Sequence, residues 1–148
     1  MTRRLLTAVV IGGAVAGLVD IAMAAVINQT GLEVIMRAIA RGVLGGAAMQ
    51  GGTLAALLGL ALQVAMGALI GLIYGLAALK APVLTRRWVA FGLLYGVAVF
   101  AVMNWVVVPL SAVGAAPKFT PPMAAANLAA MIIFALMITV SAHRGARG

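Results

Sequence analysis

The sequence contains no cysteine, only two acidic residues and a single histidine, His143, among its 148 residues. The lack of cysteine excludes disulfides, thiol catalysis, iron–sulfur clusters and cysteine-based zinc sites. One histidine cannot form a bis-histidine haem site, so we predict neither a metal centre nor another cofactor. Only 8% of the residues are charged, whereas 66% are hydrophobic and the mean hydropathy is +1.23. This composition excludes a soluble domain.

Basic residues greatly outnumber acidic ones, by ten to two, which gives a net charge of +8. They occur mainly at the ends of apolar runs, without the basic stripe or interleaved aromatic residues of a nucleic-acid-binding surface. We therefore predict no nucleic-acid partner. Short loops of membrane proteins show the same excess of Lys and Arg. The lipid bilayer is the expected partner, with anionic headgroups at the cytoplasmic face.

Four apolar runs are long enough to cross a bilayer as helices, which takes about 20 residues each. They cover approximately residues 5–27, 53–79, 88–108 and 123–142. Helices are expected because a segment in lipid must satisfy its backbone hydrogen bonds internally, and the alternation typical of barrel strands is absent. The sequence thus predicts an all-α membrane protein in which residues 1–148 form a single membrane domain, a bundle of four transmembrane helices.

The first apolar run has an alternative interpretation as a cleaved signal peptide over residues 1–24. Arg3 and Arg4 would form its basic region, and Ala22-Met23-Ala24 resembles a small-residue cleavage site. The apolar run is about twice as long as the core of a signal peptide, which favours a membrane span.

The distribution of Lys and Arg predicts the orientation of the chain. One side of the membrane would carry Arg3, Arg4, Lys80, Arg86, Arg87, Arg144 and Arg147, and the other side Arg37, Arg41 and Lys118. Because cytoplasmic loops are richer in basic residues, both termini are expected in the cytoplasm.

The first outer loop contains a helical pattern over about residues 32–48. Apolar residues recur there at spacings of three and four, and the charged residues Glu33, Arg37 and Arg41 share the opposite face. We expect an amphipathic helix that lies along the outer surface. The glycines of this loop would also suit a re-entrant turn, but three charges disfavour deep insertion.

Glycines spaced four residues apart form small faces on three of the four spans. Such faces let helix backbones approach closely and gain van der Waals contact. They either pack the bundle within the chain or bind a second copy or another membrane protein. The helix-packing candidates are Gly13, Gly17, Gly67, Gly71, Gly75, Gly92 and Gly96.

Asp20 is the one acidic residue inside a predicted span, where an ionised acid costs at least about 2.5 kcal/mol on insertion scales. The sequence leaves two roles open. Asp20 either forms a buried ion pair with Arg37 or Arg41 of the outer helix, or it exchanges a proton or cation in a polar site with Gln63 and Asn104. Glu33 and Arg37 also have the i, i+4 spacing of a helical ion pair.

For the other polar residues we expect structural roles. Gln63, Asn104 and Asn127 are expected to form hydrogen bonds between helices. His143 stands among arginines at the end of the last span, where a solvated position is expected. No nucleophile with a basic partner is recognisable, so the sequence does not predict an enzyme.

Several segments resemble uncharacterised small bacterial inner-membrane proteins related to the YagU-like family. They are Gly13-Ala14-Val15-Ala16-Gly17 with Asp20, Ile39 to Gly45, Leu93-Leu94-Tyr95-Gly96, Met103-Asn104, and Val107-Val108-Pro109-Leu110-Ser111. The resemblance implies a four-helix protein of the bacterial inner membrane and no established activity. Such relatives have histidines midway along the second and fourth helices, where this chain has Gln63 and Met131-Ile132-Ile133. That difference disfavours a histidine-based mechanism here.

Two functions are compatible with these features. The sequence favours a non-enzymatic structural or accessory membrane subunit that acts through its glycine faces. The alternative is a small proton-coupled transporter or channel that uses Asp20, broadly similar to the four-helix small multidrug exporters. An arginine within about 4 Å of the Asp20 carboxylate would favour the first function, and a cavity beside Gln63 or Asn104 would favour the second.

Overall fold

The computed structural model describes all residues from Met1 to Gly148 and contains helices but no strand. Four helical segments are long and apolar enough to cross a membrane. They comprise α1 (Thr2–Ile27), α3 (Gly52–Lys80), the segment from Trp88 to Leu110, and α7 (Pro121–Arg147). The predicted four-helix, all-α membrane architecture is confirmed, and the helices extend somewhat beyond the predicted apolar runs.

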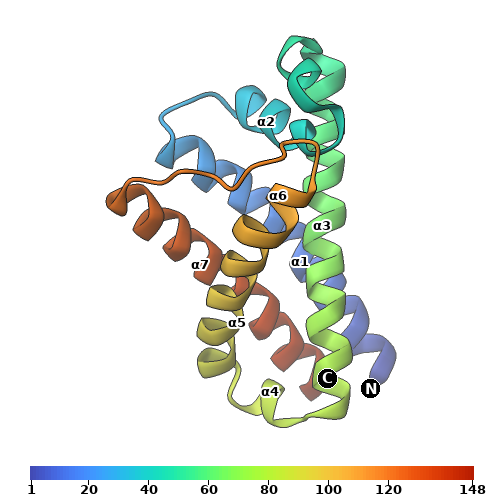
Figure 1. The fold of residues 1–148 in the computed structure, drawn as a ribbon. Coiled ribbons are helices and arrows are strands. Elements are labelled where there is room, and N and C mark those ends of the chain that lie inside the picture. The colour runs from blue at the N-terminus through green and yellow to red at the C-terminus, as the bar shows by residue number, and fades with distance from the viewer.

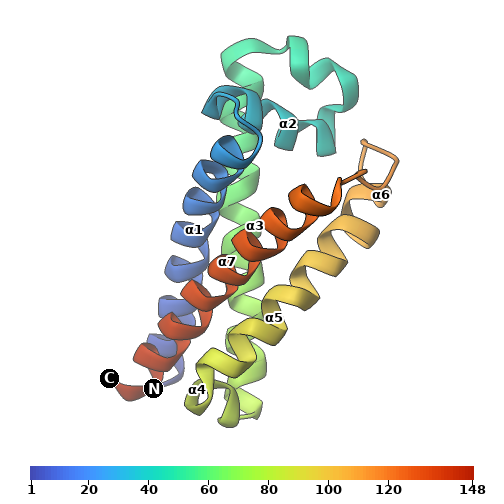
Figure 2. The same cartoon turned by 90° about the vertical axis from the view of Figure 1, so that its left-hand side faces the viewer.

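The four long helices are arranged in the order α3, α1, α7 and α5 (Trp88–Val102), so that α1 and α7 each have two neighbours. Figure 2 shows α7 lying between α1 and α5. Both termini lie at one end of the bundle, together with the single-turn helix α4 (Val83–Arg86) (Figure 1). The helix α2 (Leu32–Leu44) lies at the opposite end.

Glycine contacts bring these helices together within the chain. A side chain at Gly13, Gly67 or Gly71 would meet the backbone of the facing helix, α3 or α1. On α5, a β-carbon at Gly96 would lie 2.7 Å from the Cα atom of Ile132 in α7. The remaining packing candidates have equally close neighbours: Gly17 on Gln63, Gly75 on Val9 and Gly92 on Leu136 and Thr139. All seven glycines are thus covered inside the monomer.

The buried core occupies the half of the bundle that carries the termini. It includes Leu5 and Val9 of α1, Tyr74 of α3, and Phe134 and Ile138 of α7. These side chains close the space between α1, α3 and α7. Large apolar side chains remain exposed around the bundle, as expected for a surface that faces lipid.

The outer loop differs from the prediction in where its helix ends. The amphipathic helix was expected over about residues 32–48, but α2 ends at Leu44 and is followed by the 3₁₀ helix η1 (Gly45–Gln50). The reason is Gly45, whose φ of +63° lies in the left-handed region that ends helices. A second glycine, Gly59 of α3, receives the backbone of Met36 and docks α2 on α3.

The third span also differs from a simple helix. It was expected to end near Val108, but the chain continues through a π-helical turn, η2 (Met103–Val107), into α6 (Val108–Leu110). Pro109 explains the wide turn, because its ring would clash with the carbonyl group four residues earlier in a regular α-helix. A π turn relieves this clash and shifts the side chains that precede it.

Candidate functional site

Asp20 and Gln63 are brought together by the close packing of α1 and α3. The Gln63 amide Nε2 donates a hydrogen bond to Asp20 Oδ2 at 2.9 Å. Gly17, almost one turn before Asp20, lies against the Gln63 backbone, since a β-carbon there would be 2.9 Å from the Gln63 carbonyl oxygen. The absence of a side chain at Gly17 therefore lets a short carboxylate reach the neighbouring helix.

Of the two roles that the sequence leaves open for Asp20, the ion pair with Arg37 or Arg41 is not formed. No Lys or Arg nitrogen lies within 4.0 Å of the Asp20 carboxylate. Arg37 instead faces Glu33, with 4.0 Å between Nε and Oε1, and donates a hydrogen bond to the carbonyl oxygen of Met49 at 3.2 Å. Because Gly59 docks α2 on α3 rather than over α1, the arginines of α2 are held away from Asp20.

A small cavity of about 40 Å³ adjoins the Asp20–Gln63 pair. One buried water needs roughly 10–15 Å³ of such space, so the cavity has room for at least one water molecule. Apart from these two residues its walls are apolar and come from α3, η2 and α7: Met66, Gly67, Ile70, Met103, Met131 and Phe134.

A larger cavity of about 580 Å³ lies next to the small one, between α2, α3 and the segment around η2. Gln63, Met66 and Met103 line both cavities, so these three side chains form the boundary between them. The polar groups of the larger cavity come from α2, α3, the end of the third span and α7: Arg41, Gln63, Asn104, Ser111 and Asn127. Asp20 therefore lies at the inner end of a partly polar space that begins beside α2.

The π turn η2 supplies three residues of this space, Met103, Asn104 and Val107. Single π turns inside α-helices occur frequently at functional sites. Asn104 was expected to bond to another helix, but its Nδ2 donates to the carbonyl oxygen of Phe100 in its own helix at 2.8 Å. Asn127 likewise donates to Met123, so the expectation of interhelical bonds is wrong for both asparagines and correct for Gln63.

The two asparagines are oriented by these bonds within their own helices. Each uses an N–H group on a backbone carbonyl four residues earlier, and no protein donor reaches either side-chain oxygen. Two hydrogen-bond acceptors thus line the larger cavity and are available to a guest with N–H or O–H groups.

The sequence singled out Asp20, Gln63 and Asn104, and the structure places all three along the two adjoining cavities. It did not indicate the contribution of Arg41, which was assigned to an ion pair and instead lines the larger cavity. Nor did it indicate Ser111, which follows the last helical turn of the third span. Contacts between loops and helices that are distant in sequence leave no periodic pattern.

Other polar residues hold the bundle together away from the cavities. His143 was expected to be solvated, but its Nδ1 donates to the carbonyl oxygen of Thr85 at 2.7 Å and joins α7 to α4. The Tyr95 hydroxyl donates to the carbonyl oxygen of Ile70 at 2.8 Å and links α5 to α3. No three His, Cys, Asp or Glu side chains lie close enough together to hold a metal ion.

The chain is an integral membrane protein with one carboxylate inside the bundle, held by a neutral amide beside a cavity. Comparisons with protein-family models, with curated proteins and with solved structures found no match for it.

Proposed function

We propose that this protein is a small proton-coupled transporter of the bacterial inner membrane, with Asp20 as its proton-carrying group. The observation that carries the proposal is the partner of Asp20, which is the uncharged Gln63 and not an arginine. An ionised acid inside a span costs about 2.5–3.5 kcal/mol on insertion scales. Without a fixed positive charge beside it, Asp20 can reduce this cost by binding a proton or a cationic guest.

The arrangement of cavities and core supports alternating access. The larger cavity reaches Gln63 from the end of the bundle that carries α2, and Gln63, Met66 and Met103 separate it from the small cavity beside Asp20. The core around Phe134 and Ile138 closes the other end. A carrier needs a binding site near the middle of the membrane that opens to one side at a time. We assign this structure to the state that is open toward α2.

The orientation forms part of the proposal. The end with the termini carries most of the basic residues, and such loops are usually cytoplasmic. The open cavity would then face the outside of the cell. The resemblance to YagU-like inner-membrane proteins supports this location but adds no activity.

The sequence favoured a structural or accessory subunit, but the main argument for that function is weakened. That function relied on free glycine faces, and all seven packing glycines contact neighbours inside the chain. We also propose binding and translocation rather than covalent catalysis, because Asp20 is the only carboxylate along the cavities and has no nucleophile beside it.

Proton flux in liposomes tests the proposal. The purified protein is reconstituted with a pH-sensitive dye inside, and a potassium gradient with valinomycin imposes an inside-negative potential. The wild type is expected to acidify the lumen and Asp20→Asn to do so no faster than empty liposomes. Glu33→Gln is the matched control, since Glu33 is the only other acid and lies outside both cavities.

Both variants must elute as the wild type does in detergent, which separates loss of flux from loss of folding. Equal flux in Asp20→Asn and Glu33→Gln would refute the role of Asp20. Wild-type flux no greater than that of empty liposomes, with potentials of either sign, would refute proton transport.

A further inference from the structure

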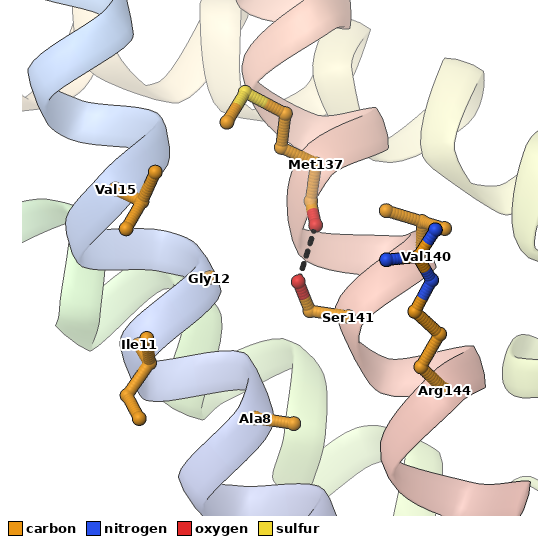
Figure 3. A pocket seen from close by; sticks show the side chains of 8 residues that line it. All are labelled: Ala8, Ile11, Gly12, Val15, Met137, Val140, Ser141 and Arg144. Atoms are coloured by element: carbon orange, nitrogen blue, oxygen red, sulfur yellow. Dashed lines mark hydrogen bonds between the residues drawn. The ribbon is translucent and has the colours of Figure 1, made fainter.

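A second surface feature is a groove on the side of the bundle where α1 and α7 meet. Figure 3 shows it between Ile11, Gly12 and Val15 on α1 and the facing residues of α7. Its volume is about 380 Å³ and its lining is predominantly apolar. It is separate from the cavities around Asp20, since none of its lining residues belongs to them.

The groove exists because its floor is made of small residues. Gly12 lies directly against Ser141, where a β-carbon would approach the Ser141 Cβ atom to 2.7 Å. The Ser141 hydroxyl donates to the carbonyl oxygen of Met137 at 2.7 Å and so presents little polarity to the groove. Ile11 and Val15, 58% and 45% exposed, rise beside this floor and face the lipid.

One edge of the groove is positively charged. Arg144 lines it, and its guanidinium extends along α7 toward Val140 (Figure 3). The Arg144 guanidinium forms no salt bridge and no hydrogen bond with the protein. Both acids of the chain are engaged elsewhere, Asp20 with Gln63 and Glu33 with Arg37. Arg144 is therefore an uncompensated cation at the edge of an apolar groove.

This pairing of an apolar groove with a free arginine matches the chemistry of one occupant. From Ala8 to Val15 the groove follows α1 for about 10 Å at 1.5 Å per residue. That length accommodates part of an acyl chain, and a guanidinium can bind a phosphate through two parallel hydrogen bonds. We propose that the α1–α7 groove binds an anionic phospholipid, with an acyl chain over Gly12 and the headgroup phosphate on Arg144.

Selective retention of lipid by the full-length protein tests this site. The protein is reconstituted in vesicles of equal phosphatidylglycerol and phosphatidylcholine, extracted, and weighed with its bound lipids by native mass spectrometry. The wild type is expected to retain phosphatidylglycerol over phosphatidylcholine by about fivefold, the contribution of one arginine near an anionic headgroup. This expectation does not depend on Asp20 or on transport.

Two variants and two matched controls separate the site from general attraction to a basic surface. Arg144→Gln is expected to bring the retention ratio close to one, whereas Arg86→Gln, at the same end of the bundle but outside the groove, keeps it. Val15→Trp fills the groove and is expected to abolish the excess of phosphatidylglycerol. Val97→Trp is its control, because Val97 is a similarly exposed valine, 47%, on α5.

Several results would overturn the proposal. Equal retention of the two lipids by the wild type would show that Arg144 selects no headgroup. Loss of selectivity in Arg144→Gln but not in Val15→Trp would show attraction to the basic surface alone. A dimer that Val15→Trp dissociates would show that a second copy of the chain covers the groove.

Discussion

Replacing Gly96 with alanine is expected to weaken the contact between α5 and α7. The new β-carbon would lie 2.7 Å from the Ile132 Cα atom and 3.2 Å from the Ile132 backbone nitrogen, whereas ordinary contacts begin near 3.4 Å. These are backbone atoms and cannot rotate away as a flexible side chain can. The two helices must therefore separate locally by roughly 0.7 Å, the difference between 3.4 and 2.7 Å.

A separation of this size forfeits about a quarter to a half of the attraction at each affected atom pair. Overpacking of this kind costs about 1–3 kcal/mol. Alanine also favours helix formation over glycine by about 1 kcal/mol, which partly offsets the loss. Gly42→Ala in α2 controls for this gain, because the nearest atom to its new β-carbon would be the Ser111 Cβ atom at 3.9 Å.

The assay is unfolding by sodium dodecyl sulfate in mixed micelles, followed by tryptophan fluorescence. Trp88 begins α5 and Trp105 lies in the following π turn, so the signal reports on this part of the bundle. Gly96→Ala is expected to be less stable than Gly42→Ala by about 1–3 kcal/mol. Equal stability of the two variants would refute the argument that α5 and α7 are packed at their closest approach through Gly96.

Three further expectations address polar groups. Tyr95→Phe removes the hydrogen bond to the Ile70 carbonyl and is expected to lower the unfolding free energy in the same assay by about 0.6 kcal/mol, up to about 1.7 kcal/mol. An unchanged unfolding free energy would mean that the hydroxyl does not stabilise the contact between α3 and α5. Arg41→Gln removes a positive charge beside the larger cavity and is expected to increase proton flux at low salt, with a smaller increase at 1 M salt. A change in flux that does not depend on salt would contradict an electrostatic cause. Gln63→Leu leaves the Asp20 carboxylate without its hydrogen-bond donor and is expected to lower the unfolding free energy by about 1–3 kcal/mol, but clearly less in an Asp20→Asn background. Equal losses in the two backgrounds would show that the two side chains are uncoupled.

The spans could be predicted from the sequence because hydropathy depends only on residues close together in the chain. The glycine spacing likewise indicated close helix packing, and the structure shows which backbones meet, such as Gly13 with Gly67. The π turn was not predictable in this way. Pro109 indicated a break in the third helix, but whether a helix ends or widens before a proline depends on the groups packed around it.

The candidate site was partly predictable for a related reason. An acid in a span identified Asp20, and amides in other spans identified Gln63 and Asn104. The partner of Asp20 could not be deduced, because it depends on how α2 docks on α3 through Gly59, a contact between segments distant in sequence. The same docking turns Arg41 toward the larger cavity, a role that helical periodicity alone could not distinguish from an ion pair.

The order of helices across the bundle affects how the chain is assembled during synthesis. α7 follows the other spans in the chain, yet it packs between α1 and α5, and its Met131 and Phe134 form part of the wall around Asp20. α5 must enter the membrane before its main partner exists, held to α3 chiefly through Tyr95. Until α7 is inserted, the pair of Asp20 and Gln63 lacks that wall and lies open to lipid or to the insertion machinery. Nascent chains arrested before α7 would therefore display a polar pair in the membrane that the finished molecule covers.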